Sequence, residues 1–376
     1  MKGISKKQRG ISLIVLVITI IVMIILASAI ILSLQSSGII GRANEAKNKS
    51  DEATLREAAS IKLAEYELGV QMGDIASTTT ASEYVKEELE KDGVDITGLA
   101  ITPDGSIQTG LSEIAVKFVE AGIKVGDTVT GYDLSSNTTT SYTTDGKENT
   151  APLGAETDPT VQTIARGTEL AWKYIGIDEN GDALIVADST GTLSEMRLSG
   201  KGGYLNGPEV LDTACAALYS SDMGKARSID YEDVIKLLDY IGPQGHYYDD
   251  EGNEVKIDEP LTLGEIYNWS DEFADLKWDD ITISKTDTYI RAGETAKQIV
   301  YQQKIYWLAS SCVGYDYEGG EVYFELRSCD SSHIWHQFMS GSTGGATGST
   351  CSIRPVVKLA SDVQMSYNGT TVTLSK

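Results

Sequence analysis

The sequence predicts an α+β chain in three parts: a long N-terminal hydrophobic helix, a small α+β neck and a larger α+β domain at the C-terminus. Three observations predict this fold class. Residues 11–34 are uncharged and contain neither Gly nor Pro. Apolar residues at helical spacing follow over residues 42–68, and short alternating runs bounded by turn residues fill much of the remainder. With 376 residues, the chain is also longer than a typical domain of about 100–200 residues.

The apolar run 11–34 indicates an N-terminus inserted in a membrane. At about 1.5 Å per residue a helix over this run spans roughly 36 Å, which exceeds the ~30 Å hydrocarbon core of a bilayer. The apolar region of a cleaved secretory signal has only about 7–15 residues. Basic residues precede the run, and the first acidic residue after it is Glu45. The positive-inside rule therefore predicts a single-pass protein with its N-terminus in the cytoplasm and the remainder outside.

The N-terminus resembles that of type IV prepilins and pseudopilins. The resemblance is carried by a basic leader, residues 1–10, which ends in Gly10 and is followed by the apolar sequence ISLIVLV. It implies that a prepilin peptidase cuts after Gly10, that Ile11 becomes N-methylated, and that residues 11–70 join copies of the chain in an extracellular pilus. The family usually has Glu at the fifth mature position, where this chain has Val15, so subunits would pack there by apolar contact. The alternative is a single-pass anchor that is neither cut nor polymerised.

The rest of the chain divides by composition. The long helix is expected over residues 11–74, because apolar residues keep helical spacing until a Gly-Asp pair ends the pattern. Residues 75–133 combine a short acidic helix with short apolar strands and are expected to form the small α+β neck. Residues 134–163 are rich in Ser and Thr and have the composition of a linker. Residues 164–376 are expected to form a surface domain.

Charge and missing motifs exclude several classes of function. The net charge is −24, whereas nucleic-acid binding needs basic surfaces, so we expect no nucleic-acid partner. No P-loop, no dinucleotide fingerprint and no GxSxG motif occurs. Three histidines in the whole chain supply few general bases. We therefore expect neither an enzyme nor a bound cofactor.

The four cysteines are candidates for disulfides, because an exported domain lies in an oxidising environment. Four cysteines allow three complete pairings, and the sequence does not choose between them. No CxxC motif is present to indicate a zinc ribbon or a redox site. The residues are Cys215, Cys312, Cys329 and Cys351.

Two patterns could suggest a metal. Asp178-x-Asn180-x-Asp182 superficially resembles a calcium loop, but its Gly comes at the fourth position instead of the sixth, and Ser189 stands where a bidentate Glu is needed. Apolar runs on both sides of Asn180-Gly181 instead predict a hairpin with a type I′ turn.

A second pattern combines Cys329, His333 and His336, which could hold a transition metal if they shared a helical face. The stretch is rich in Gly and Ser and lacks a suitably spaced fourth ligand. We therefore expect no metal site.

The C-terminal third contains YWLAS, then a polar glycine-rich stretch over residues 331–350, then IRPVV. Residues 165–360 thereby resemble the C-type-lectin-like fold, in the branch shared by formylglycine-generating-enzyme-like proteins and the hypervariable tip domains of diversity-generating retroelements. The resemblance implies that an irregular segment, residues 315–351, forms the ligand face; its aromatic residues could alternatively be buried among the loops. The ligand-binding candidates are Tyr315, Tyr317, His333, Trp335, His336 and Phe338.

Together these features predict a type IV pilin-like subunit that displays an adhesive or ligand-binding domain on the cell surface. Its expected partners are other copies of the chain, the prepilin peptidase, the membrane and an unknown surface ligand. Two alternatives are a non-polymerising surface protein and an ectoenzyme of the formylglycine-generating type that uses Cys329 or Cys351.

Overall fold

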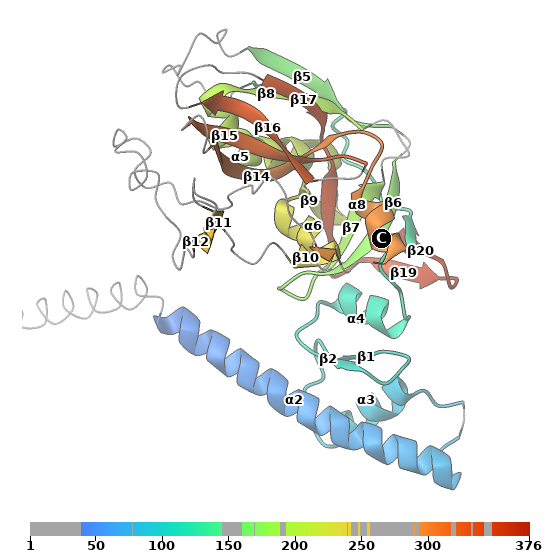
Figure 1. The fold of residues 1–376 in the computed structure, drawn as a ribbon. Helices are drawn as coiled ribbons and strands as arrows, with labels where there is room; N and C mark the ends of the chain where they lie inside the picture. Colours follow the sequence, from blue (N-terminus) through green and yellow to red (C-terminus); the bar gives the residue numbers. More distant parts are fainter. Residues whose placement is uncertain are drawn as a thin grey trace, which may run out of the picture. The chain divides into compact units, whose positions relative to one another are not determined.

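The computed structural model describes most of the chain beyond its N-terminus. The described residues are 39–76, 78–144, 160–168, 170–188, 193–238, 240–241, 247–248, 254–255, 289–290, 293–316, 321–331, 334–341 and 348–376. The chain divides into two compact units, Met1–Ile96 (unit one) and Thr97–Lys376 (unit two) (Figure 1).

Unit one is built on the helices α2 (Ile39–Met72) and α3 (Ala81–Lys91), which pack against each other. Ala59 of α2 and Val85 and Leu89 of α3 are buried. A capping box starts α3: the side chain of its N-cap residue accepts a hydrogen bond from the third helical residue, and the reverse bond is also made.

The fold class predicted from the sequence is wrong, because the described residues contain no long apolar helix. Although α2 is long, charged residues are spread along it, and no helix of the described part of the chain is apolar enough to cross a membrane. The run 11–34 lies outside the described residues, as do Gly10, Ile11 and Val15.

Unit two contains a seven-stranded sheet in the order β19-β20-β3-β6-β7-β18-β9. Neighbouring strands are antiparallel except β20 and β3, which run parallel. The strands are β3 (Thr128–Thr130), β6 (Ala171–Ile177), β7 (Ala183–Asp188), β9 (Gly224–Ser228), β18 (Pro355–Leu359), β19 (Gln364–Tyr367) and β20 (Thr371–Ser375).

A second, five-stranded sheet has the order β16-β15-β14-β17-β8, with only β14 and β17 parallel. The helix α5 (Gly200–Tyr219) packs against this sheet and against β9 of the first sheet (Figure 1). The strands are β8 (Glu195–Ser199), β14 (Tyr306–Asp316), β15 (Glu321–Cys329), β16 (Ile334–Gly341) and β17 (Gly348–Ser352).

The remaining elements of unit two are short. The helices are α4 (Glu113–Glu120), α6 (Tyr231–Leu237) and α8 (Glu294–Val300). The antiparallel strand pairs are β1 (Ala100–Ile101) with β2 (Ile107–Gln108), β4 (Thr139–Thr143) with β5 (Val161–Ala165), β10 (Tyr240–Ile241) with β13 (Tyr289–Ile290), and β11 (Tyr247–Tyr248) with β12 (Glu254–Val255).

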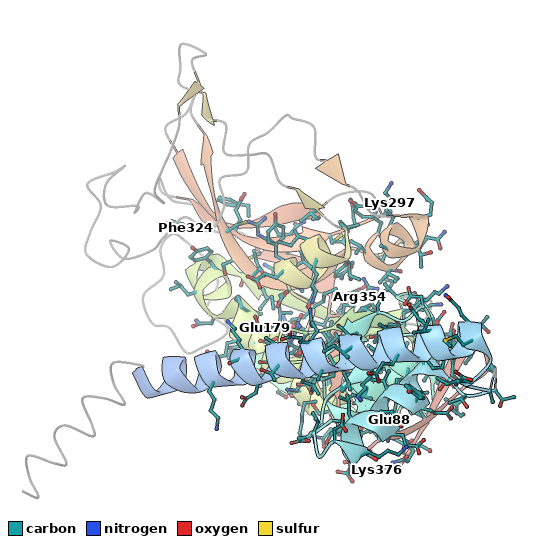
Figure 2. The ribbon with its side chains drawn as sticks, turned by 90° about the horizontal axis from the view of Figure 1, so that it is seen from below. Glu88, Glu179, Lys297, Phe324, Arg354 and Lys376 are labelled. Carbon is teal, nitrogen blue, oxygen red and sulfur yellow. The ribbon has the colours of Figure 1, made fainter. Side chains whose placement is uncertain are left out.

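Two hydrophobic cores hold unit two together. The larger joins α4, α5 and both sheets and includes Phe118, Trp172 and Phe324, the last of which is marked in Figure 2. The smaller core lies under α6 and α8 and includes Val234 and Val300. The α6 helix and the strands beneath it are therefore anchored by apolar burial, the main favourable term in folding.

The predicted neck, residues 75–133, does not form a separate unit. Its last strand, β3, is an interior strand of the seven-stranded sheet, between β20 and β6. The core of unit two also contains Phe118 of α4. Within the predicted linker, residues 134–163, β4 pairs with β5. The sequence could not indicate this arrangement, because β20 lies about 240 residues further along the chain.

The predicted lectin-like arrangement, with an irregular ligand face over residues 315–351, is also wrong. That segment contains the end of β14 and the strands β15, β16 and β17, and the pairing of β15 with β16 runs from Tyr323↔Gly341 to Cys329↔Ile334. The Gly and Ser residues of the segment suggested a loop, but the parts of it that the structure describes pair with neighbouring strands.

Candidate functional site

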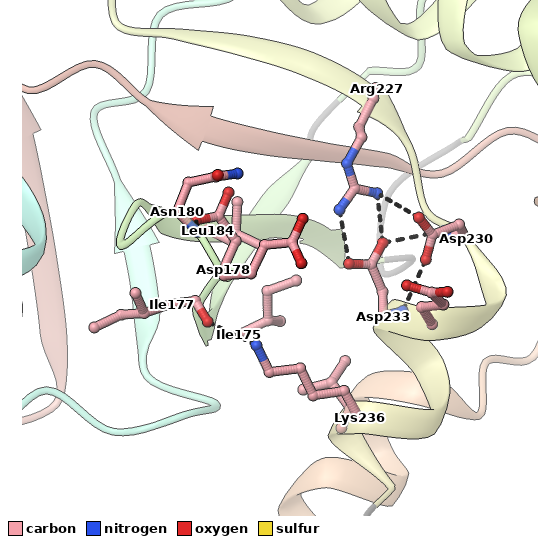
Figure 3. Close-up of a pocket in the computed structure, with 12 residues that line it drawn as sticks. Ile175, Ile177, Asp178, Asn180, Leu184, Arg227, Asp230, Asp233 and Lys236 are labelled. Carbon is pink, nitrogen blue, oxygen red and sulfur yellow. Dashed lines mark hydrogen bonds and ion pairs between the residues drawn. The ribbon is translucent and has the colours of Figure 1, made fainter. Parts of the chain in front are cut away.

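A pocket of about 340 Å³ opens in unit two beside the β6–β7 turn and α6 (Figure 3). We call it the acidic pocket, since carboxylate side chains outnumber basic ones in its wall. It is lined by Ile175, Ile177, Asp178, Glu179, Asn180, Leu184, Arg227, Asp230, Glu232, Asp233, Lys236 and Leu237.

One wall of the acidic pocket is the β6–β7 turn. Hydrogen bonds to its first residue, Asp178, close this turn. Asp178 Oδ1 accepts hydrogen bonds from the backbone N–H groups of Asn180 and Asp182, each at 2.9 Å. The predicted hairpin is confirmed, but Ile177 pairs with Ala183, so the loop has five residues and not the two of a type I′ turn. The pattern that resembled a calcium loop is thus explained by turn geometry.

The opposite wall is the start of α6. Asp230 Oδ1 accepts from the backbone N–H of Asp233 at 2.8 Å, and Asp233 Oδ2 accepts from the backbone N–H of Asp230 at 3.1 Å. This reciprocal arrangement is a capping box, which satisfies N–H groups that a helix start otherwise leaves without partners. Both carboxylates are therefore fixed in position.

Arg227, on β9, ties this wall to the sheet. It donates from Nη1 to Asp233 Oδ2 at 2.5 Å and from Nη2 to Asp233 Oδ1 at 2.7 Å, a bidentate pair (Figure 3). Asp230 Oδ2 lies further from Nη1, at 3.4 Å. Burial raises the pKa of Asp230 to about 6, and the nearby charge of Asp233 adds to the rise.

The charges in the wall do not balance. Five carboxylates, on Asp178, Glu179, Asp230, Glu232 and Asp233, face two cations. Arg227 is engaged by Asp233 and Asp230, and Lys236 Nζ donates to the backbone carbonyl of Ile177 at 2.8 Å. Within the described part of the chain, neither Glu179 nor Glu232 forms an ion pair, and both are exposed.

The floor of the acidic pocket is apolar. Ile175 and Leu184, on neighbouring strands, are 8% and 7% exposed, and Leu237 of α6 adjoins them in the lining. The lining contains no Ser, Thr, Cys, His or Tyr side chain that could act as a nucleophile. The acidic pocket therefore combines charged side chains, which we call the rim, with the apolar side chains of the floor.

A second, smaller pocket of about 160 Å³ lies between β4 and α5. Hydroxyl groups dominate its wall, and the hydroxyl of Tyr142 donates to Gln162 Oε1 at 2.9 Å. The lining residues are Thr140, Ser141, Tyr142, Thr143, Glu209, Val210, Thr213 and Ala214.

Phe338 is the ligand-binding candidate whose side chain the structure describes, and it lines neither of these two pockets. Trp335, His336 and Phe338 belong to β16, and Phe338 is half-buried opposite Glu325 of β15. Tyr315 lies near the end of β14.

Two further candidates, Tyr317 and His333, lie outside the described residues. The combination with Cys329 and His336 that was considered for a metal, and not expected to hold one, therefore falls partly outside them too. Among the residues that the structure describes, no group of His, Cys, Asp and Glu side chains is arranged to hold a metal ion.

The four cysteines form no disulfide, contrary to the pairing expected for an exported domain. Cys215, Cys312, Cys329 and Cys351 are all free and buried, on α5, β14, β15 and β17. Burial raises the pKa of Cys329 to about 11 and that of Cys351 to about 12. Both thiols are therefore protonated at neutral pH, whereas the nucleophile is the thiolate.

Sequence reasoning missed the α6 wall of the acidic pocket. The acidic residues Asp230 and Asp233 have the three-residue spacing of a capping box, which could have indicated the start of α6. Nothing local indicates that this helix faces the β6–β7 turn, about 50 residues earlier in the chain. No protein-family model, no curated protein and no solved structure matches the chain, so its site is interpreted from its own geometry.

Proposed function

We propose that the chain is a pilin-like surface protein whose unit two binds a ligand and catalyses no reaction. Residues 11–34 would hold it in the membrane or among copies of itself in a filament. Cutting by a prepilin peptidase between Gly10 and Ile11 would precede assembly. The basic leader and the apolar run support this location.

The single observation that carries the binding role is the acidic pocket. Its volume of about 340 Å³ is at the lower end of the ~300–1,000 Å³ usual for ligand sites. Hydrogen bonds within the turn and the capping box, together with the Arg227–Asp233 pair, hold its polar groups in place without a ligand. Such preorganisation lowers the cost of binding.

Two features favour binding over catalysis. The described lining of the acidic pocket contains no Ser, Thr, Cys, His or Tyr side chain. Cys329 and Cys351, on which a formylglycine-generating activity would depend, are buried and protonated. The geometry thus supports a recognition site more than an ectoenzyme.

The location is tested by mass spectrometry of the mature N-terminus. We expect a chain that begins with N-methylated Ile11 and is held at the cell surface. Gly10→Leu should block the cut, whereas Gly3→Leu, in the same leader, should leave it intact. A mature chain that still begins with Met1 would contradict pilin-type processing and favour the non-polymerising surface protein.

A further inference from the structure

We propose that the acidic pocket binds an organic cation, a primary ammonium or guanidinium group on a short apolar stem, such as a lysine or arginine side chain of a peptide. This inference rests on the binding role proposed above and specifies the class of ligand.

Two carboxylates of the acidic pocket have no cationic partner among the described residues. Arg227 is occupied by Asp233, and the ammonium of Lys236 is bound to the carbonyl of Ile177. Glu179 from the turn and Glu232 from α6 line the same pocket on opposite walls and pair with no cation of the described residues. A ligand cation between these walls would therefore be attracted to both.

The apolar floor suits an alkyl chain. The nearly buried side chains of Ile175 and Leu184 line the same pocket as the carboxylates. An alkyl stem removed from water there gains about 0.8 kcal/mol per buried CH₂ group, and a long basic side chain combines such a stem with a charged tip. The contrast between rim and floor thus matches an amphiphilic cation.

The described residues suit an organic cation better than a metal ion. The described residues contain no cluster of carboxylates arranged to coordinate a metal ion. The Asp178 carboxylate is also turned to its own backbone, where it accepts two N–H groups. An organic cation needs no such cage, since it can donate to carboxylates and carbonyls spread around a rim. Lys236 already shows this behaviour, because its ammonium is held by a backbone carbonyl at the edge of the pocket.

Binding should depend on pH, because Asp230 has a raised pKa of about 6. The charged groups around it are Asp178 and Glu179 from the turn, Arg227 from β9, and Glu232, Asp233 and Lys236 from α6. Protonation of Asp230 removes a negative charge from the rim, so affinity for a cation should increase as the pH rises from 5 to 7.5.

The experiment uses the full chain in detergent micelles and measures binding by calorimetry at low ionic strength. The probes are pentylamine, the neutral pentanol and the anionic pentanoate, which share one alkyl stem. We expect saturable binding of pentylamine alone, weakened by added salt. Pentylguanidine, with the same alkyl stem, supplies the guanidinium form of the test.

The variant Glu179→Gln/Glu232→Gln should weaken pentylamine binding by about tenfold, because two exposed charges facing the ligand are neutralised. The control Glu113→Gln/Glu294→Gln changes the net charge of the same unit equally, at exposed positions on α4 and α8. It should leave binding unchanged.

Equal binding of pentanol or pentanoate would overturn the cation assignment while leaving a binding function in place. Equal weakening in the control variant would overturn the assignment to this pocket. Failure of both pentylamine and pentylguanidine to bind at millimolar concentration would overturn the inference. The proposed surface location would be unaffected by any of these results, since N-terminal processing tests it separately.

Discussion

At the residue scale, Arg354 shows how a charged side chain can be retained inside unit two. It is fully buried immediately before β18 (Figure 2), and its guanidinium lies 4.8 Å from the centre of the Tyr306 ring. Nε donates to the carbonyl of Ala187 at 2.9 Å, and Nη2 donates to the carbonyl of Ile299 at 2.6 Å. Because Ile299 is in the last turn of α8, Arg354 satisfies a carbonyl at the end where a helix attracts cations.

Replacing Arg354 with Met should therefore lower the free energy of unfolding by about 1–3 kcal/mol. The carbonyl of Ala187 would lose the Nε donor, and that of Ile299 would keep only the side-chain amide of Gln302. Removal of a desolvated charge would offset part of the cost. Chemical denaturation followed by tryptophan fluorescence measures the change. Lys225→Met, on the exposed side of the neighbouring strand β9, is the control and should have little effect. Equal stability of the two variants would contradict this role.

Asp230 should make the stability of unit two depend on pH. Its pKa in the folded chain, about 6, lies above its ordinary value of 3.8 because of burial, so the folded state takes up the proton more readily than the unfolded state. Its contribution to the free energy of unfolding should therefore increase as the pH falls from 7.5 through 6 towards 4.

The variant Asp230→Asn isolates this contribution, since Asn keeps an oxygen that can cap α6. The stability of the variant minus that of the parent should be larger at pH 7.5 than at pH 5. Thermal unfolding of both proteins at each pH measures this difference. A difference between the proteins that does not vary with pH would contradict the raised pKa.

At the scale of the element, the β6–β7 turn shows why a particular glycine is needed. Gly181 has φ +81°, and a Cβ atom there would lie 2.0 Å from the carbonyl oxygen of Gly110. The Gly181 carbonyl in turn accepts from the backbone N–H of Ser112 at 2.9 Å. The turn is thus pressed against the segment before α4, which fixes the wall that carries Asp178 and Glu179.

Gly181→Ala should lower the free energy of unfolding by about 2–4 kcal/mol and weaken pentylamine binding. The left-handed backbone conformation alone costs an L-residue about 1–3 kcal/mol, and the contact with Gly110 adds to this cost. Gly369→Ala is the matched control: its φ is +98°, but nothing lies within 4 Å of the added Cβ. If the two variants are equally stable and bind equally well, close packing of the turn is unimportant.

At the scale of the whole molecule, the position where unit two begins, Thr97, determines which fragments of the chain can fold. A fragment from Thr97 to Lys376 retains β3 and α4, whereas one from Ile164 to Lys376 lacks both. Without β3, the strands β20 and β6 lose the neighbour that lies between them. The larger core would also lose Phe118, which is fully buried.

We therefore expect the fragment beginning at Thr97 to unfold cooperatively and the fragment beginning at Ile164 to show no cooperative transition. Differential scanning calorimetry of both fragments tests this expectation. A sharp transition in the shorter fragment would mean that the first part of unit two is dispensable for folding.

The sequence by itself determined the features that depend on near neighbours. The apolar run 11–34, the net charge and the hairpin at Asn180-Gly181 can all be read from local composition and spacing. The strands β14, β15 and β18 lie on short apolar or alternating runs, which are of the kind that predicts strands.

Only the tertiary structure decided what depends on distant partners. It placed β3 beside β20, made strands of residues 334–341 and 348–352, and buried Arg354 against α8. It also assembled the acidic pocket from the β6–β7 turn, β9 and α6. The physical reason is that backbone pairing and desolvation are set by the residues opposite in space, and no local pattern records which residues those are.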